Sequence, residues 1–326
     1  MSTLPGMNPL HNTSALFARA SRNSQRVIVP INDSALRKDT LGPAFYCVHD
    51  ITGVAGSDFI DLARRLDMTA QFYGIQAPPK KMADVDFGSS IESLAEYYAD
   101  ALRRFQPEGP FFLGGFCAGA IIALDIALKM HAFGREVALL VAIDAVPENT
   151  RPQLQPWNPK YVAQLLCNLP GWFKHGGLSK QKDSHSLLRR VANNAIAIGN
   201  VALGRRPNDK FGGGHVIDGQ MDLSRYPPEQ RDFINRFYNA CFAYFAASYS
   251  GEIVVYEASV KPLVHLPQLR SRWRGIAPQA EFVGITGTHL SMLREPYVGE
   301  LAHDLGPRIG LHKPKEISSI APTRMI

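Results

Sequence analysis

The chain has 326 residues, of which 45% are hydrophobic and 20% charged, with a formal net charge of +6 at pH 7. This length and composition fit one large α/β domain with an insertion. No run of 18 apolar residues occurs, and residues 1–24 lack the apolar region of a secretory signal, so we expect neither a membrane span nor export. Lysine and arginine are scattered without a binding motif, which argues against nucleic acid as a partner.

The number and spacing of the cysteines indicate the redox environment of the protein. The four cysteines are sparse and form no C-x-x-C pair. This pattern is typical of a reducing environment and argues against a zinc site. We therefore expect a cytoplasmic protein without a bound metal.

Short apolar runs alternate with helical patterns along the chain. The predicted strands are residues 27–30 (an edge-strand candidate), 44–49, 71–75, 111–114, 137–143, 252–256 and 280–285. The predicted helices are residues 57–66, 90–105, 120–131, 228–249 and 297–305. The alternation predicts a mostly parallel central sheet with helices on both faces.

The same pattern divides the chain. We expect a leader or linker at residues 1–40, a main domain at residues 41–310 and a disordered tail at residues 311–326. Between residues 150 and 230 the alternation breaks, and helical segments lie among stretches that contain proline and glycine. We therefore predict an inserted helical lid there.

The most informative motif is Gly115-Phe116-Cys117-Ala118-Gly119, a G-x-C-x-G sequence between a predicted strand and a predicted helix. This is the setting of a nucleophile elbow, the strained turn of the α/β-hydrolase fold. Small flanking residues let the backbone turn sharply, and the helix N-terminus favours a thiolate. The motif predicts an α/β-hydrolase with Cys117 as its nucleophile.

Such a nucleophile needs a base, and the base needs an acid to orient it. In α/β-hydrolases the three follow in the order nucleophile, acid, histidine, each after a strand. Asp144 follows the predicted strand 137–143, and His289 follows the predicted strand 280–285. The order predicts a triad of Cys117, Asp144 and His289.

Two other acids compete for the role of Asp144. Many α/β-hydrolases place the acid after the strand that ends here near Glu257. Glu257 is expected to lie within that strand, and no aspartate follows it. Asp125, on the helix behind the elbow, is expected to be structural.

An oxyanion hole uses two backbone N–H groups. One is expected from Ala118, directly after the nucleophile, and the other from Ile51, in the loop after the first buried strand. His49 precedes that loop, and we interpret it as a residue that positions the loop.

These motifs together resemble the thioesterase domains of polyketide, nonribosomal-peptide and fatty-acid synthases. The resemblance covers residues 44–305 and rests on the first-strand loop at 48–53, the elbow at 114–120, the acid-bearing strand end at 142–144, the histidine loop at 287–293 with Pro296, and the junction at 249–253. Two positions differ from the family. Cys117 stands where most members have serine, and Asp50 stands where proline is common.

The resemblance implies an enzyme that takes an acyl or peptidyl chain from the phosphopantetheine thioester of a carrier protein, with no bound cofactor. Release by cyclisation, transfer or hydrolysis is expected, and other synthase domains are further possible partners. A cysteine would hold the chain as a thioester, which stays activated for a second nucleophile. The alternatives are an acyltransferase with a separate amine or hydroxyl acceptor, a non-catalytic binding protein, and a serine replaced by cysteine to trap an intermediate.

Overall fold

The computed structural model describes residues 26–36, 42–56, 58–67, 70–147, 167, 170–171, 223, 226–261 and 268–310. A seven-stranded sheet lies at its centre, in the order β1-β3-β2-β4-β5-β6-β7. The strands are β1 (Ile28–Pro30), β2 (Ala44–Val48), β3 (Gln71–Ile75), β4 (Phe111–Phe116), β5 (Val137–Ile143), β6 (Ile253–Val260) and β7 (Glu281–Thr288). β1 runs antiparallel to β3, and the other neighbouring strands run parallel. The predicted mostly parallel sheet is confirmed.

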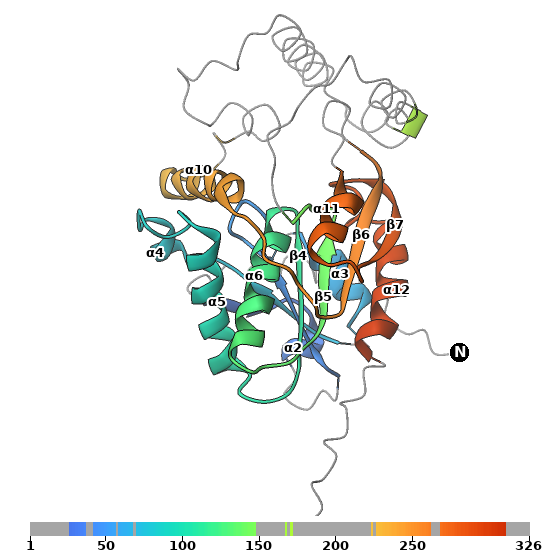
Figure 1. The fold of residues 1–326 in the computed structure, drawn as a ribbon, viewed down its shortest axis with the longest axis horizontal. Coiled ribbons are helices and arrows are strands. Elements are labelled where there is room, and N and C mark those ends of the chain that lie inside the picture. Colours follow the sequence, from blue (N-terminus) through green and yellow to red (C-terminus); the bar gives the residue numbers. More distant parts are fainter. Residues whose placement is uncertain are drawn as a thin grey trace, which may run out of the picture.

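Helices cover both faces of this sheet (Figure 1). They are α2 (Asp33–Leu36), α3 (Ile60–Arg65), α4 (Pro79–Met82), α5 (Ile91–Phe105), α6 (Ala118–Ala132), α10 (Pro228–Ala243), α11 (Leu269–Ile276) and α12 (Val298–Gly310). One hydrophobic core joins the sheet to α5, α6, α10 and α11. A second core, on the opposite face, joins it to α3 and α12. The layers are those of an α/β-hydrolase.

The sequence accounts for the two elements that support the site. In α5, the hydroxyl of Ser90 accepts a hydrogen bond from the Ser93 N–H at 3.1 Å and so satisfies one free donor of the first turn. Apolar residues recur every three or four positions and bury one face of α5. All seven residues of β5 are buried, as expected for a central parallel strand covered on both sides.

Several boundaries differ from the sequence prediction, two of them by five or more residues. The helix expected at residues 228–249 ends at Ala243, because Tyr244 adopts an extended conformation and donates its hydroxyl hydrogen to Asp125 at 3.0 Å. The last helix continues to Gly310 and contains Pro307. In addition, β1 brings residues 28–30 into the sheet, ahead of the domain boundary expected at residue 41.

Most of the predicted lid at residues 150–230, residues 1–25 and 37–40 of the predicted leader, and the tail at 311–326 lie outside the described residues. Where the structure is described, no helix combines the length and the apolar character needed to cross a membrane.

Candidate active site

Cys117 lies on the sharp turn between β4 and α6, half-buried, at φ 55° and ψ −129°. Positive φ is strained for a residue with a side chain. The Cys117 N–H donates to the carbonyl of Ile143 at 3.1 Å and ties the turn to β5. A Cβ added at Gly115 would lie 2.3 Å from the carbonyl group of Gly119, so the turn requires glycine there. The strained strand–turn–helix predicted from the motif is present.

Asp144 follows β5 at the same edge of the sheet, also at positive φ (46°). Its Oδ2 lies 2.8 Å from Nδ1 of His289, which follows β7. Its Oδ1 accepts the N–H of Ala258 at 2.8 Å and lies 3.4 Å from Nζ of Lys261. Burial acts to raise the pKa of Asp144, but the hydrogen bond and charge of His289, with the charge of Lys261, outweigh it and lower the pKa to about 2. Asp144 is therefore an ionised carboxylate at neutral pH.

The imidazole of His289 lies between the carboxylate and the sulfur. Burial acts to lower the pKa of His289, but the charge of Cys117 and the hydrogen bond to Asp144 outweigh it and raise the pKa to about 10. A hydrogen bond to Cys117 acts in the same direction. Because Asp144 occupies Nδ1, Nε2 is the ring nitrogen left to face the sulfur. The structure thus brings the three predicted residues together.

The competing acids have other partners. Glu257 lies within β6, as expected, and forms ion pairs with Arg270 and, at 3.5 Å, with Lys261. Asp125 accepts a hydrogen bond from Tyr244, and burial raises its pKa. Neither carboxylate contacts His289 in the hydrogen bonds described, which leaves Asp144 as the acid partner of the histidine.

The oxyanion loop, defined here as residues 49–53, borders the elbow. β2 and β4 are parallel neighbours with Val48 beside Gly115, so the loop that follows β2 lies next to Cys117. The Asp50 carboxylate accepts the Thr52 N–H at 2.9 Å and so fixes the shape of the loop. The N–H groups of Ile51 and Ala118 belong to the two segments that flank Cys117, and their role in an oxyanion hole stays a prediction.

Three features of the site were missed from the sequence. Lys261 contacts Asp144 across 117 positions of chain, which no local pattern indicates. The ring of Phe116 stacks on His289 at 4.5 Å between centroids. The third feature is a pair of neighbouring acids, Asp50 and Asp58. Burial and the charge of Asp58 raise the pKa of Asp50 to about 7, and Arg294 lies 3.2 Å from Asp58. The departure from proline at position 50 was the one signal for this acidic pair.

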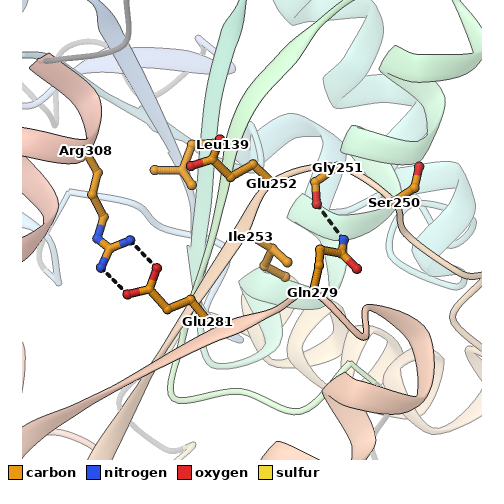
Figure 2. Close-up of a pocket in the computed structure, with 8 residues that line it drawn as sticks. All are labelled: Leu139, Ser250, Gly251, Glu252, Ile253, Gln279, Glu281 and Arg308. Atoms are coloured by element: carbon orange, nitrogen blue, oxygen red, sulfur yellow. Dashed lines mark hydrogen bonds and ion pairs between the residues drawn. The ribbon is translucent and has the colours of Figure 1, made fainter.

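A cavity of about 360 Å³ lies elsewhere, at the amino ends of β6 and β7 (Figure 2). Arg308 forms an ion pair with Glu281 at one side, and Gln279 donates to the carbonyl of Gly251 at 2.7 Å on the other. The triad residues lie at the carboxyl ends of the strands. This cavity is therefore separate from the candidate active site.

The thioesterase-domain family model matches residues 43–177. Malpinin synthetase of Mortierella alpina is 28% identical over 195 residues, which are 60% of this chain and 2% of the synthetase. Non-reducing polyketide synthase cla3 of Cladosporium cladosporioides is 33% identical over 106 residues, 31% of this chain and 5% of the synthase. The chain thus spans a small fraction of these relatives.

Among solved structures, the NocB thioesterase domain in covalent complex with a nocardicin G analogue is similar, with a TM-score of 0.52 and 19% identity over 88% of this chain and 100% of that domain. At this identity the likeness concerns the fold. The protein has an α/β-hydrolase fold, and within it residues 43–177 match the thioesterase-domain model and parts of the chain are similar to segments of peptide and polyketide synthases.

Proposed function

We propose that this protein is a thioesterase that receives an acyl or peptidyl chain from the phosphopantetheine thioester of a carrier protein and holds it on Cys117. The observation that carries the proposal is the pairing of His289 with Asp144 at 2.8 Å, beside a cysteine on a strained elbow. A nucleophile, a base and an orienting acid are the parts that acyl transfer requires.

In the first step the thiolate of Cys117 attacks the thioester carbonyl carbon. A new bond forms between that carbon and the Cys117 sulfur, the bond to the pantetheine sulfur breaks, and the departing thiol takes a proton from the His289 imidazolium. The His289 imidazolium can supply that proton at neutral pH, because its pKa is raised to about 10. One thioester replaces another, so the chain remains activated.

In the second step neutral His289 removes a proton from the incoming nucleophile. The charge of Cys117, which raises the pKa of His289, is absent once the sulfur is acylated, so the imidazole becomes easier to deprotonate. The nucleophile bonds to the acyl carbon, the bond to the Cys117 sulfur breaks, and the thiolate leaves beside the His289 imidazolium, which keeps the proton. An amine or hydroxyl of the same chain gives cyclisation, a separate acceptor gives transfer, and water gives hydrolysis. The N–H groups of Ala118 and Ile51 would hold the oxyanion in both steps.

The partner is proposed on two grounds. The relatives are synthases many times longer than this chain, which fits a domain that works beside a carrier protein. The net charge of +6 suits an acidic carrier surface. No bound cofactor is needed in this scheme, because the pantetheine arm arrives with the substrate.

Intact-mass spectrometry tests the proposal. Incubation with acyl-pantetheine thioesters is expected to add one acyl group, which Cys117→Ala abolishes together with turnover. Cys167→Ala is the matched control, because this cysteine is exposed and would take a non-specific adduct. If turnover survives Cys117→Ala and the wild type gains no adduct, the assignment of Cys117 as the nucleophile is contradicted. Product that forms only when a separate amine or hydroxyl is added would identify the acyltransferase alternative.

A further inference from the structure

The proposed reaction gives no role to His49, a buried titratable side chain next to the site. His49, directly after β2, is fully buried. Its ring lies edge-on to Tyr98, Phe233 and Phe237, with centroids 5.6, 6.1 and 5.7 Å away. Burial among these rings lowers the pKa of His49 to about 4, against a smaller opposite effect of the Asp50 carbonyl. The imidazole is therefore neutral at neutral pH, with one donor and one acceptor nitrogen.

The two neighbours of His49 determine which nitrogen carries the proton. Nδ1 lies 2.5 Å from the carbonyl oxygen of Asp50, and Nε2 lies 2.7 Å from the hydroxyl of Tyr98. A carbonyl oxygen can only accept, so Nδ1 is the donor. Nε2 must then accept the hydroxyl hydrogen of Tyr98. The chain of hydrogen bonds runs from Tyr98 on α5 through His49 to the backbone of the oxyanion loop.

The carbonyl of Asp50 and the N–H of Ile51 belong to one peptide unit. In a trans peptide these two groups point in opposite directions, and the one cis bond among the described residues is Glu295-Pro296. His49 holds the carbonyl on the buried side, and the Gly53 N–H also donates to it at 3.2 Å. Fixing the carbonyl therefore fixes the direction of the Ile51 N–H, away from the core.

This peptide lies beside the elbow. A Cβ added at Gly119 would lie 2.2 Å from the carbonyl oxygen of His49, so the first turn of α6 touches the start of the loop. Val48 pairs with Gly115 in the sheet. A donor that leaves the core at Ile51 thus lies next to the turn that carries Cys117.

We infer that His49 is a positioning residue for the oxyanion hole: its Nδ1–H, oriented by the Tyr98 hydroxyl, turns the Ile51 N–H toward the oxyanion that forms when Cys117 attacks. The inference rests on the proposed function. Both ring nitrogens are engaged and the ring is sealed from solvent, so His49 transfers no proton. Its effect is confined to steps in which a carbonyl oxygen gains charge.

Two reactions of the same sulfur separate this role from a merely structural one. Acylation by an acyl-pantetheine thioester passes through an oxyanion, whereas alkylation by iodoacetamide does not. His49→Leu removes the donor, and His49→Asn keeps an N–H close to the position of Nδ1. We expect His49→Leu to slow acylation about 100-fold, the typical effect of losing one oxyanion donor, with an unchanged alkylation rate. His49→Asn is expected to recover most of the acylation rate.

Tyr98→Phe provides a second variant that retains the packing and removes the hydroxyl. It is expected to slow acylation several-fold and leave alkylation unchanged. Equal loss of both reactions in His49→Leu and Tyr98→Phe, or wild-type acylation in both, would overturn the inference. Wild-type protein that alkylates but never acylates would instead overturn the proposed function.

Discussion

The ring of His289 stacks on the ring of Phe116, with centroids 4.5 Å apart and 24° between the planes. Phe116 is the second residue of the G-x-C-x-G motif and the last residue of β4, and it is 4% exposed. One face of the imidazole therefore lies against a rigid surface, while Asp144 holds its Nδ1 edge. The two contacts together restrict both the tilt and the rotation of the ring.

Phe116→Leu is expected to remove the stacking surface while keeping the site apolar. The imidazole then samples more orientations, and we expect kcat to fall about 10-fold with little change in KM, since a misaligned base costs rate more than binding. Steady-state kinetics with an acyl-pantetheine thioester measures this. Phe112→Leu, a similarly buried change on the same strand, is the control. An equal loss in both variants would show that general destabilisation of β4 is the cause.

Lys261 is expected to moderate the effect of Asp144 on His289. Its ammonium group lies 3.4 Å from Asp144 and lowers the pKa of that carboxyl. Without this cation, the carboxylate stabilises the imidazolium more strongly, so the pKa of His289 rises. Because release from the acyl-enzyme needs neutral His289, Lys261→Met should shift the acidic limb of the kcat–pH profile upward by about half a pH unit.

Arg270→Met is the matched control for Lys261→Met. Arg270 pairs with Glu257, as Lys261 does, but among the described residues it forms no ion pair with Asp144. The acidic limb of the kcat–pH profile of Arg270→Met should coincide with that of the wild type. A profile of Lys261→Met that coincides with that of Arg270→Met would show that Lys261 has no influence on the histidine.

Asp144 is expected to couple stability to pH. The folded protein holds its pKa at about 2, below the ordinary 3.8, so its contribution is present above pH 3.8 and is lost as the pH falls toward 2. The difference in unfolding free energy between the wild type and Asp144→Asn should therefore shrink by about 1 kcal/mol between pH 6 and pH 3.

Urea denaturation at a series of pH values measures this difference. Asp100→Asn is the control, because this carboxylate is 44% exposed and its ion pair with Arg103 is at the surface, where such pairs contribute little. A difference for Asp144→Asn that stays constant over the same range would contradict the assigned pKa direction.

Gly119→Ala is expected to destabilise the fold at the elbow. The new Cβ would lie 2.2 Å from the His49 oxygen and 2.6 Å from the Val48 oxygen, and both are backbone atoms of the sheet and its loop. We expect a loss of about 2 to 3 kcal/mol in unfolding free energy, measured by denaturation. Gly275→Ala is the control on α11, where a Cβ meets nothing within 4 Å. It is expected to be neutral or stabilising, and similar losses in both would contradict the steric explanation.

Much of the fold followed from the sequence, because its signals are local. Apolar runs of four to seven residues predicted the six parallel strands β2 to β7 within a few residues. The helix after the elbow was predicted from the helical pattern at residues 120–131, and 11 of the 15 residues of α6 are buried. The predicted end of α10 was wrong, since Tyr244 leaves the helix and donates a hydrogen bond to Asp125, a partner 119 positions away.

The candidate site divides in the same way. The sequence by itself determined the elbow and the order of Cys117, Asp144 and His289, because parallel strands bring their carboxyl ends to one edge of the sheet whatever the intervening chain contains. Only the tertiary structure decided which groups tune these residues. The contacts of Lys261 with Asp144, of Phe116 with His289 and of Tyr98 with His49 join distant segments at 2.7 to 4.5 Å, and neither spacing nor periodicity in the sequence indicates such contacts.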